Sequence, residues 1–155
     1  LAVVATDLYS GEKVVIDKGL VAPAVKASCA IPGIFKPVKW GGTLLVDGGV
    51  TERVPVATAR KMGADFVIAV DVGVYPNKQK INHFLDVITQ SIDIMSKELN
   101  HHRIQSADFI ISPKLENVAA SQFHLAPQII AIGEEAAEQE LENLQSQLGR
   151  SELLA

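Results

Sequence analysis

Runs of aliphatic residues alternate with short turn-forming stretches over the first 50 residues of the chain. Residues 1–8 and 12–17 are two such runs with a Tyr-Ser-Gly turn between them, and they predict a β-hairpin. Residues 35–40 have an extended pattern, and residues 43–46 form another short aliphatic run after a Gly-Gly turn. This part of the chain is therefore expected to be rich in strands.

The rest of the chain alternates between helical and strand patterns. Residues 66–72 are an almost unbroken aliphatic run, which is typical of a strand buried on both faces, and residues 107–111 predict a second buried strand. Residues 82–105 predict a long amphipathic helix, because apolar side chains recur every three or four positions. These side chains are Phe84, Leu85, Ile88, Ile92, Met95 and Leu99. The other predicted helices span residues 21–30, 55–62 (ended by Gly63) and 126–148, and residues 118–123 are expected to form a loop.

The order of these elements is that of an α/β protein. A helix followed by a buried strand is half of a βαβ unit. In addition, 48% of the residues are hydrophobic and only 5% are aromatic, so the core is expected to be aliphatic. Such a core suits a parallel sheet covered by helices. With no repeat or interdomain linker in its 155 residues, the chain is expected to be one domain or part of one.

Charge and cysteine content exclude several classes of protein. The net charge is −4 and the basic residues form no stripe, which argues against nucleic-acid binding. No apolar run reaches the roughly 18 residues that a membrane span needs. The single cysteine, Cys29, cannot form an intramolecular disulfide, so a cytoplasmic location is expected. Cys29 lies among small residues and is expected to be a buried, inert thiol rather than a nucleophile.

An Asp-Gly-Gly tripeptide directly after the predicted strand 43–46 is the strongest candidate for chemistry. Asp47 is a poor strand residue at a position where catalytic groups gather in α/β sheets. Gly48 and Gly49 permit a close backbone approach that side chains would block. A carboxylate so placed can accept the proton of a hydroxyl nucleophile. The alternative is an ordinary Asp-Gly turn.

A longer block of sequence around this tripeptide resembles the patatin-like phospholipase family. The resemblance covers at least residues 1–73 and lies in five segments, at residues 5–12, 27–38, 42–50, 54–55 and 63–65. The helical second half of the chain fits a bacterial member but is less diagnostic.

The resemblance implies a three-layer α/β fold of the acyl transferase/lysophospholipase type with a mainly parallel central sheet. It also implies a lipid acyl ester hydrolase that uses a Ser–Asp dyad without a catalytic histidine, a metal or a cofactor. In that family the serine lies in a Gly-x-Ser-x-Gly turn, and a glycine-rich loop binds the oxyanion. Asp47 matches the dyad aspartate, and Gly48 and Gly49 match its companions. The resemblance further implies a lipid or other ester substrate and transient contact with a membrane surface.

Two departures from the family pattern limit what the chain is expected to do. Neither Gly-x-Ser-x-Gly nor a glycine-rich oxyanion loop occurs in these 155 residues. Residues 1–155 are therefore expected to be the C-terminal portion of one patatin-like domain, with the nucleophile upstream and the chain inactive alone. Sheet edges left uncovered in such a portion would favour self-association. The second departure is Glu52 and Arg53, which stand near a position where many relatives carry Asn, so their role stays open.

Other interpretations remain open at this stage. The fold could be a non-catalytic scaffold or regulatory module without the serine, or an unrelated α/β binding domain. Asp7 and Asp71, each near a predicted strand end, are alternative acidic site residues.

Several side chains are instead expected to have structural roles. The four histidines (His83, His101, His102 and His124) lack metal-ligand spacing and are expected to be structural or on the surface. Core packing is favoured over an acyl-chain pocket for Ile34, Phe35 and Trp40.

Overall fold

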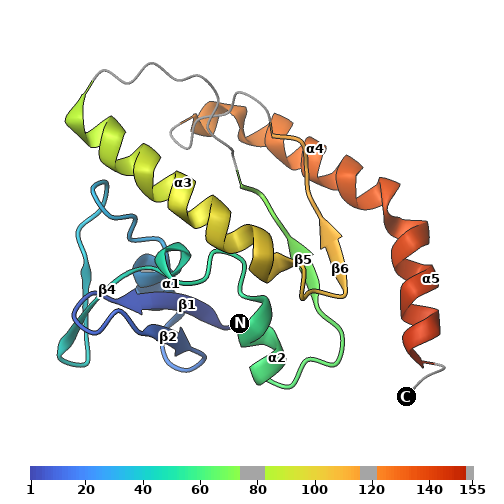
Figure 1. The fold of residues 1–155 in the computed structure, drawn as a ribbon, viewed down its shortest axis with the longest axis horizontal. Coiled ribbons are helices and arrows are strands. Elements are labelled where there is room, and N and C mark those ends of the chain that lie inside the picture. The colour runs from blue at the N-terminus through green and yellow to red at the C-terminus, as the bar shows by residue number, and fades with distance from the viewer. Residues whose placement is uncertain (74–82, 116–121, 153–155) are drawn as a thin grey trace.

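A computed structural model describes residues 1–73, 83–115 and 122–152 of the chain (Figure 1). The elements run in the order β1 (Val3–Asp7), β2 (Lys13–Ile16), α1 (Val21–Ser28), β3 (Val38–Trp40), β4 (Thr43–Asp47), the 3₁₀ turn η1 (Gly48–Val50), α2 (Val56–Lys61), β5 (Ile68–Val70), α3 (Phe84–Ile104), β6 (Phe109–Ile111), the 3₁₀ turn η2 (Phe123–Leu125), α4 (Ala126–Gln139) and α5 (Leu141–Glu152). The alternation of helices and strands agrees with the α/β class predicted from the sequence.

The first four strands form one antiparallel sheet in the order β2-β1-β4-β3. β1 is central, and Ala5 lies opposite Val14 of β2 on one side and Asp47 of β4 on the other. The expectation of a mainly parallel sheet is wrong for the described residues, where only β5 and β6 pair in parallel. Short connections explain two of the three antiparallel pairs, β1–β2 and β3–β4, because a tight hairpin can join only antiparallel neighbours.

The β3–β4 hairpin shows how the sequence sets this topology. Trp40 pairs with Thr43 across a two-residue loop of Gly41 and Gly42, whose φ angles are +52° and +90°. Positive φ at both central residues is typical of the tight hairpin turns that match strand twist, and glycine adopts it without steric cost. The Gly-Gly pair is therefore a hairpin turn, which delivers β4 and Asp47 back along β1.

A βαβ unit made of β5, α3 and β6 is present in the second half of the chain. The half-unit predicted from the sequence, a helix followed by a buried strand, corresponds to α2 and β5. β5 and β6 pair in parallel with Ile68 opposite Phe109, and α3 lies between them in sequence. However, β5 is not buried on both faces as expected. Ala69 is buried, whereas Ile68 and Val70 are 44% and 48% exposed. The described residues cover one face of this strand and leave the other open.

The helices largely follow the predicted boundaries. Gly63, with a φ of +95°, follows the end of α2 as expected. The helix predicted over residues 126–148 is instead two helices separated at Glu140, whose N–H bonds to the Ala137 carbonyl in the tighter 3₁₀ pattern. The loop predicted at residues 118–123 falls mostly outside the described residues. No helix in the described parts of the chain is both long and apolar enough to span a membrane.

Two hydrophobic clusters form the core. One joins the antiparallel sheet to α1, and Trp40 packs against it as expected. The other joins α2, β5 and the end of α3, with Val56 and Ile104 among its buried members. In contrast, Ile34, Phe35 and the thiol-bearing Cys29 are exposed, so the core positions expected for these three residues are wrong. Their segment, between α1 and β3, turns outward after the buried Ala30.

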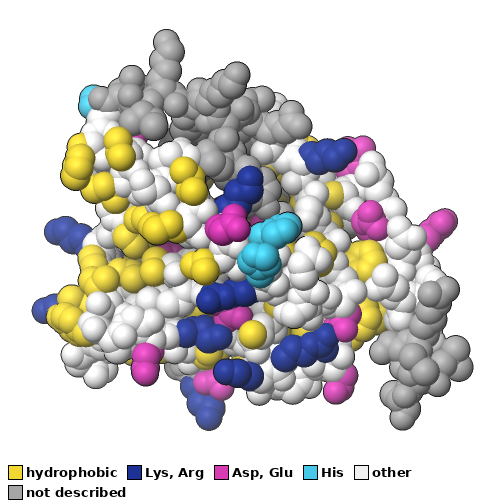
Figure 2. Space-filling model, in the orientation of Figure 1, with side chains coloured by type: hydrophobic (Ala, Val, Ile, Leu, Met, Phe, Trp, Pro, Cys, Tyr) yellow, Lys and Arg dark blue, Asp and Glu magenta, His cyan; other side chains and the backbone are white. Residues whose placement is uncertain are grey.

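Much of the apolar stripe predicted for α3 is exposed. Phe84, Met95 and Leu99 are at least half exposed, although the helix itself forms as predicted. Figure 2 shows hydrophobic side chains on the surface along α3 and on the neighbouring part of the same face. The apolar pattern therefore predicted the helix correctly, although the described residues do not fully bury its apolar side chains.

Candidate active site

Asp47 ends β4 at the point where the strand enters the turn η1. Its backbone N–H donates to the Ala30 carbonyl at 3.0 Å, and its own carbonyl accepts from the Thr6 hydroxyl at 3.1 Å. The backbone of Asp47 is thus fixed from two sides, by β1 and by the segment after α1.

Of the two glycines that follow Asp47, Gly48 is required by its surroundings and Gly49 lies against the Asp47 carboxylate. A side-chain carbon added at Gly48 would collide with the carbonyl oxygen of Val4, so the buried Gly48 lets the chain turn directly against β1. The Gly49 N–H donates to Asp47 Oδ1 at 2.6 Å, and a Cβ at Gly49 would lie 2.9 Å from the same oxygen. The tripeptide is therefore a tight turn in which the carboxylate caps η1.

The surroundings of Asp47 favour its protonated form on balance. Burial raises the pKa of the Asp47 carboxyl, while the Gly49 N–H and the positive charge of Arg53 act in the opposite direction without cancelling the rise. A carboxylate with a raised pKa is a stronger base than an ordinary surface aspartate, which suits proton transfer.

Asp47 lines a cleft of about 220 Å³ between the antiparallel sheet and α3. The segment after α1 supplies an apolar wall with Ile31 and Pro32. The remaining lining residues come from the stretch after β4 and from α3, and they are Gly49, Val50, Arg53, Ile92, Asp93 and Ser96. The cleft thus combines an apolar wall with a small number of charged and polar groups, a composition common in small-molecule sites.

Arg53 and Asp93 face each other in this cleft. Their closest nitrogen and oxygen atoms are 3.9 Å apart, and their side chains are 29% and 53% exposed. That separation exceeds a hydrogen bond, so the pair is a weak electrostatic contact across the cleft.

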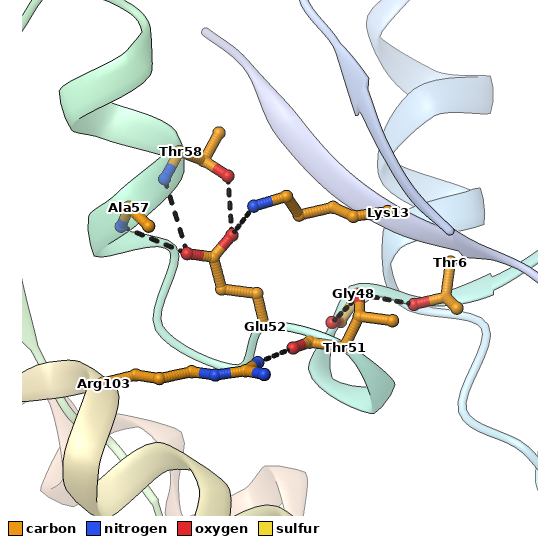
Figure 3. Close-up of polar contacts among 8 residues, drawn as sticks. All are labelled: Thr6, Lys13, Gly48, Thr51, Glu52, Ala57, Thr58 and Arg103. Carbon is orange, nitrogen blue, oxygen red and sulfur yellow. Dashed lines mark hydrogen bonds and ion pairs between the residues drawn. The ribbon is translucent and has the colours of Figure 1, made fainter. Parts of the chain in front are cut away.

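Glu52, the neighbour of Arg53, is 5% exposed and anchors the loop between η1 and α2 (Figure 3). Its carboxylate accepts from the Thr58 hydroxyl at 2.6 Å and from the Ala57 N–H at 3.1 Å, and it forms an ion pair with Lys13 of β2. Burial raises the pKa of Glu52, but the bonds from Lys13 and Thr58 outweigh it, and the pKa stays below its usual value. A buried carboxylate at a helix start satisfies N–H groups that the helix cannot pair internally.

The loop is also tied to α3 and to β1. Arg103 of α3 donates to the Thr51 carbonyl, and the Thr51 hydroxyl lies 2.9 Å from that of Thr6 (Figure 3). The Glu52 N–H donates to the Gly48 carbonyl at 2.7 Å. Four elements, β1, β2, α2 and α3, therefore hold the loop that follows Asp47.

The alternative acidic candidates lie away from the cleft lining. Asp7 pairs with Leu45 in the middle of β4 and accepts at 2.5 Å from the hydroxyl of Thr43, at the opposite end of β4 from Asp47, and this hydrogen bond lowers the pKa of Asp7. Asp71 is buried and accepts from the Asn100 side-chain amide at 3.3 Å and from the Gly73 N–H. Both carboxylates have structural bonding of their own.

The histidines take positions that fit structural roles. His83 precedes α3, where its N–H donates to the Asp86 carboxylate at 2.8 Å. The rings of His101 and His102 meet edge to face, with centroids 5.5 Å apart. Within the described ranges, no group of three or more His, Cys, Asp or Glu side chains is placed to hold a metal ion.

Sequence reasoning alone did not find the α3 side of the cleft. Asp93 and Ser96 are more than 40 residues from Asp47 along the chain, and nothing in their local pattern marks them. For Arg53 the sequence contains one indication, because Glu52 and Arg53 depart from the family pattern at this position.

Comparisons with known proteins agree with the α/β class of this fold. Residues 1–60 match the family model described as patatin-like phospholipase. Proteins of the NTE family from Mycobacterium bovis and Mycobacterium tuberculosis are 42% identical over 69 residues, which is 44% of this chain and 19% of each relative. Lysophospholipase NTE1 of Debaryomyces hansenii is 37% identical over 59 residues, which is 38% of this chain and 4% of that protein.

The chain therefore spans less than a fifth of the length of these relatives. The comparisons confirm the resemblance to the patatin-like phospholipase family, and the matched residues 1–60 include Asp47.

Replacing Gly48 by alanine is expected to lower the free energy of unfolding by about 3 kcal/mol, at the upper end of overpacking costs, because the new methyl group collides with the Val4 carbonyl. The matched control is Gly133→Ala in α4, where a Cβ meets nothing and alanine should stabilise by about 0.5–1 kcal/mol. Urea unfolding of both variants measures the difference. Equal stabilities would contradict the close approach of η1 to β1.

Glu52→Ala is expected to cost about 3–5 kcal/mol, since it leaves the partners of a buried ion pair unsatisfied. Because the folded-state pKa of Glu52 is lowered, its contribution is full above the unfolded pKa and is lost as pH falls through the folded value. Urea unfolding between pH 7 and pH 3 should therefore show that the difference in free energy of unfolding between wild type and Glu52→Ala becomes smaller as the pH falls. A difference that does not change with pH would count against an ionised Glu52.

Proposed function

We propose that this chain supplies the acidic half of the active site of a lipid acyl ester hydrolase. Asp47 is the general base, and the nucleophile is a serine in a Gly-x-Ser-x-Gly segment outside these 155 residues. The observation that carries the proposal is the position of Asp47, a partly buried carboxylate with a raised pKa in a cleft, within the part of the chain that matches the family.

The chemistry follows from what a carboxylate at this position can do. Asp47 accepts the proton of the serine hydroxyl as the serine oxygen attacks the ester carbonyl. Backbone amides of a glycine-rich loop, also outside the chain, hold the oxyanion. The alcohol leaves with a proton, and water, deprotonated in turn by Asp47, releases the fatty acid from the acyl-enzyme.

The cleft supports an ester with a hydrocarbon part. Ile31, Pro32, Val50 and Ile92 provide apolar surface beside the carboxylate. Such surface favours an acyl chain through the hydrophobic effect. Under the same proposal, residues 1–155 are the C-terminal portion of one patatin-like domain, the protein is cytoplasmic, and its lipid substrate brings it into transient contact with membrane surfaces.

The complete protein with Asp47→Asn is expected to lose at least about 100-fold in kcat for a short-chain ester, the lower range for loss of a general base. The side-chain amide of this variant retains an oxygen that can accept from the Gly49 N–H, so the turn should persist. The matched control is Asp17→Asn, which changes an exposed carboxylate beyond the cleft and should leave kcat unchanged.

Near-normal activity of Asp47→Asn, with the folded state verified by circular dichroism, would sink the assignment. The 155-residue chain by itself should not release a chromogenic ester's alcohol above the rate of a blank. Ester cleavage by the chain alone would show that the nucleophile lies within it.

A further inference from the structure

The guanidinium of Arg53 is placed in the cleft with its hydrogen-bond donors unused by the described residues. Arg53 lines the same cleft as Asp47, and its contact with Asp93 at 3.9 Å is too long for a hydrogen bond. Arg60, by comparison, donates to the Ala64 and Asp65 carbonyls and pairs with Asp108. Arg53 differs because it packs into a site without completing its bonds there.

The position of this guanidinium is nevertheless defined. The guanidinium lies beside the backbone of Gly73, just beyond β5, because a Cβ built there would be in van der Waals contact with an Arg53 nitrogen at 3.6 Å. Asp93 approaches from α3 on another side. With only 29% of its side chain exposed, Arg53 has lost much of its hydration and freedom before any ligand arrives.

The charged groups of the cleft are Asp47, Arg53 and Asp93. Asp93 is more than half exposed and is held by no hydrogen bond to Arg53, so an incoming anion can take its place at small cost. A planar guanidinium binds phosphate oxygens through two parallel hydrogen bonds, which are stronger and more directional than a contact at 3.9 Å. Ser96 adds a hydroxyl donor to the same lining.

We propose that Arg53 is a substrate-binding residue that recognises the phosphate of an acyl lipid whose ester carbonyl lies beside Asp47. This inference rests on the proposed function and adds a specificity-determining residue to it. Arg53 selects the anionic ester over a neutral ester with the same acyl chain, and Asp93 weakens that selection by competing for the guanidinium.

The test uses the complete protein and two esters with the same short acyl chain, a monoacylglycerol 3-phosphate and the corresponding neutral monoacylglycerol. Arg53→Gln should raise KM for the phosphate ester at least about tenfold, the loss expected for a charge-assisted hydrogen bond, with kcat nearly unchanged. Its kcat/KM for the neutral ester should stay within about threefold of the wild-type value, because that ester offers the guanidinium no anion. Arg53→Lys should retain part of the preference, and Asp93→Asn should lower KM for the phosphate ester.

Lys61→Gln is the matched control, because it removes an exposed positive charge of α2 that does not line the cleft. It should change the kinetics of neither substrate. If Arg53→Gln lowers kcat/KM equally for both esters, Arg53 acts on Asp47 rather than on the substrate, and the inference is overturned. The inference is likewise overturned if Arg53→Gln does not change the ratio of kcat/KM for the phosphate ester to kcat/KM for the neutral ester.

A binding measurement keeps this inference separate from the proposed catalysis. In the Asp47→Asn background, calorimetry should show the phosphate ester binding at least about tenfold more weakly after Arg53→Gln. Glycerol 3-phosphate, which has the phosphate but no acyl chain, should bind less tightly than the lipid. If glycerol 3-phosphate and the phosphate ester bind equally tightly, the site recognises free phosphate, and the assignment of a lipid ligand is overturned. Binding of the phosphate ester that is unchanged by Arg53→Gln would overturn the inference, whereas Arg53-dependent binding with unimpaired hydrolysis in Asp47→Asn would instead reject the role of Asp47.

Discussion

The backbone of η1 lies against the carbonyl of Val4 so closely that only glycine fits at position 48. This contact decides where the chain turns after β4, and with it the position of Asp47. The Asp47 carboxylate is then oriented locally, because the Gly49 N–H holds one of its oxygens. The position of the Asp47 carboxylate thus depends on the register of β1 against β4, on the contact between Gly48 and Val4, and on the hydrogen bond from Gly49. A shift in the strand register would displace the carboxylate.

Glu52 and Arg53 show how adjacent residues in one loop have opposite environments. Glu52 points inward to Lys13 and the start of α2, where protein groups donate hydrogen bonds to its carboxylate. Arg53 lies in the cleft, where its donors are not satisfied by the described residues. A fully bonded buried charge rigidifies its surroundings, whereas an arginine with unused donors is suited to an external anion. The anchored loop thus gives Arg53 a fixed base from which to act.

Local signals in the sequence predicted the elements that depend on neighbours in the chain. The Gly41-Gly42 hairpin, the end of α2 at Gly63 and the length of α3 follow from turn chemistry and periodicity. Burial was harder to predict, because it depends on partners distant in sequence. The aliphatic run around Ile68 indicated two covered faces, yet the described residues cover one. For the same reason Asp47 could be predicted as a site residue from its motif and from the family resemblance of the flanking sequence, whereas Asp93 and Ser96 were identified only from the position of α3 beside the cleft.

Opposing effects set the pKa of Asp47. Burial disfavours the charged carboxylate, whereas the Gly49 N–H and, to a smaller extent, the positive charge of Arg53 favour it. An anion bound to Arg53 would offset the positive charge that Asp47 feels, and the pKa of Asp47 would then rise further. By linkage, ionised Asp47 and a bound anion disfavour each other, so part of the binding free energy of an anionic ester is spent in making the carboxylate more basic. Under the proposed roles of these two residues, recognition at Arg53 and proton transfer at Asp47 are therefore coupled through charge.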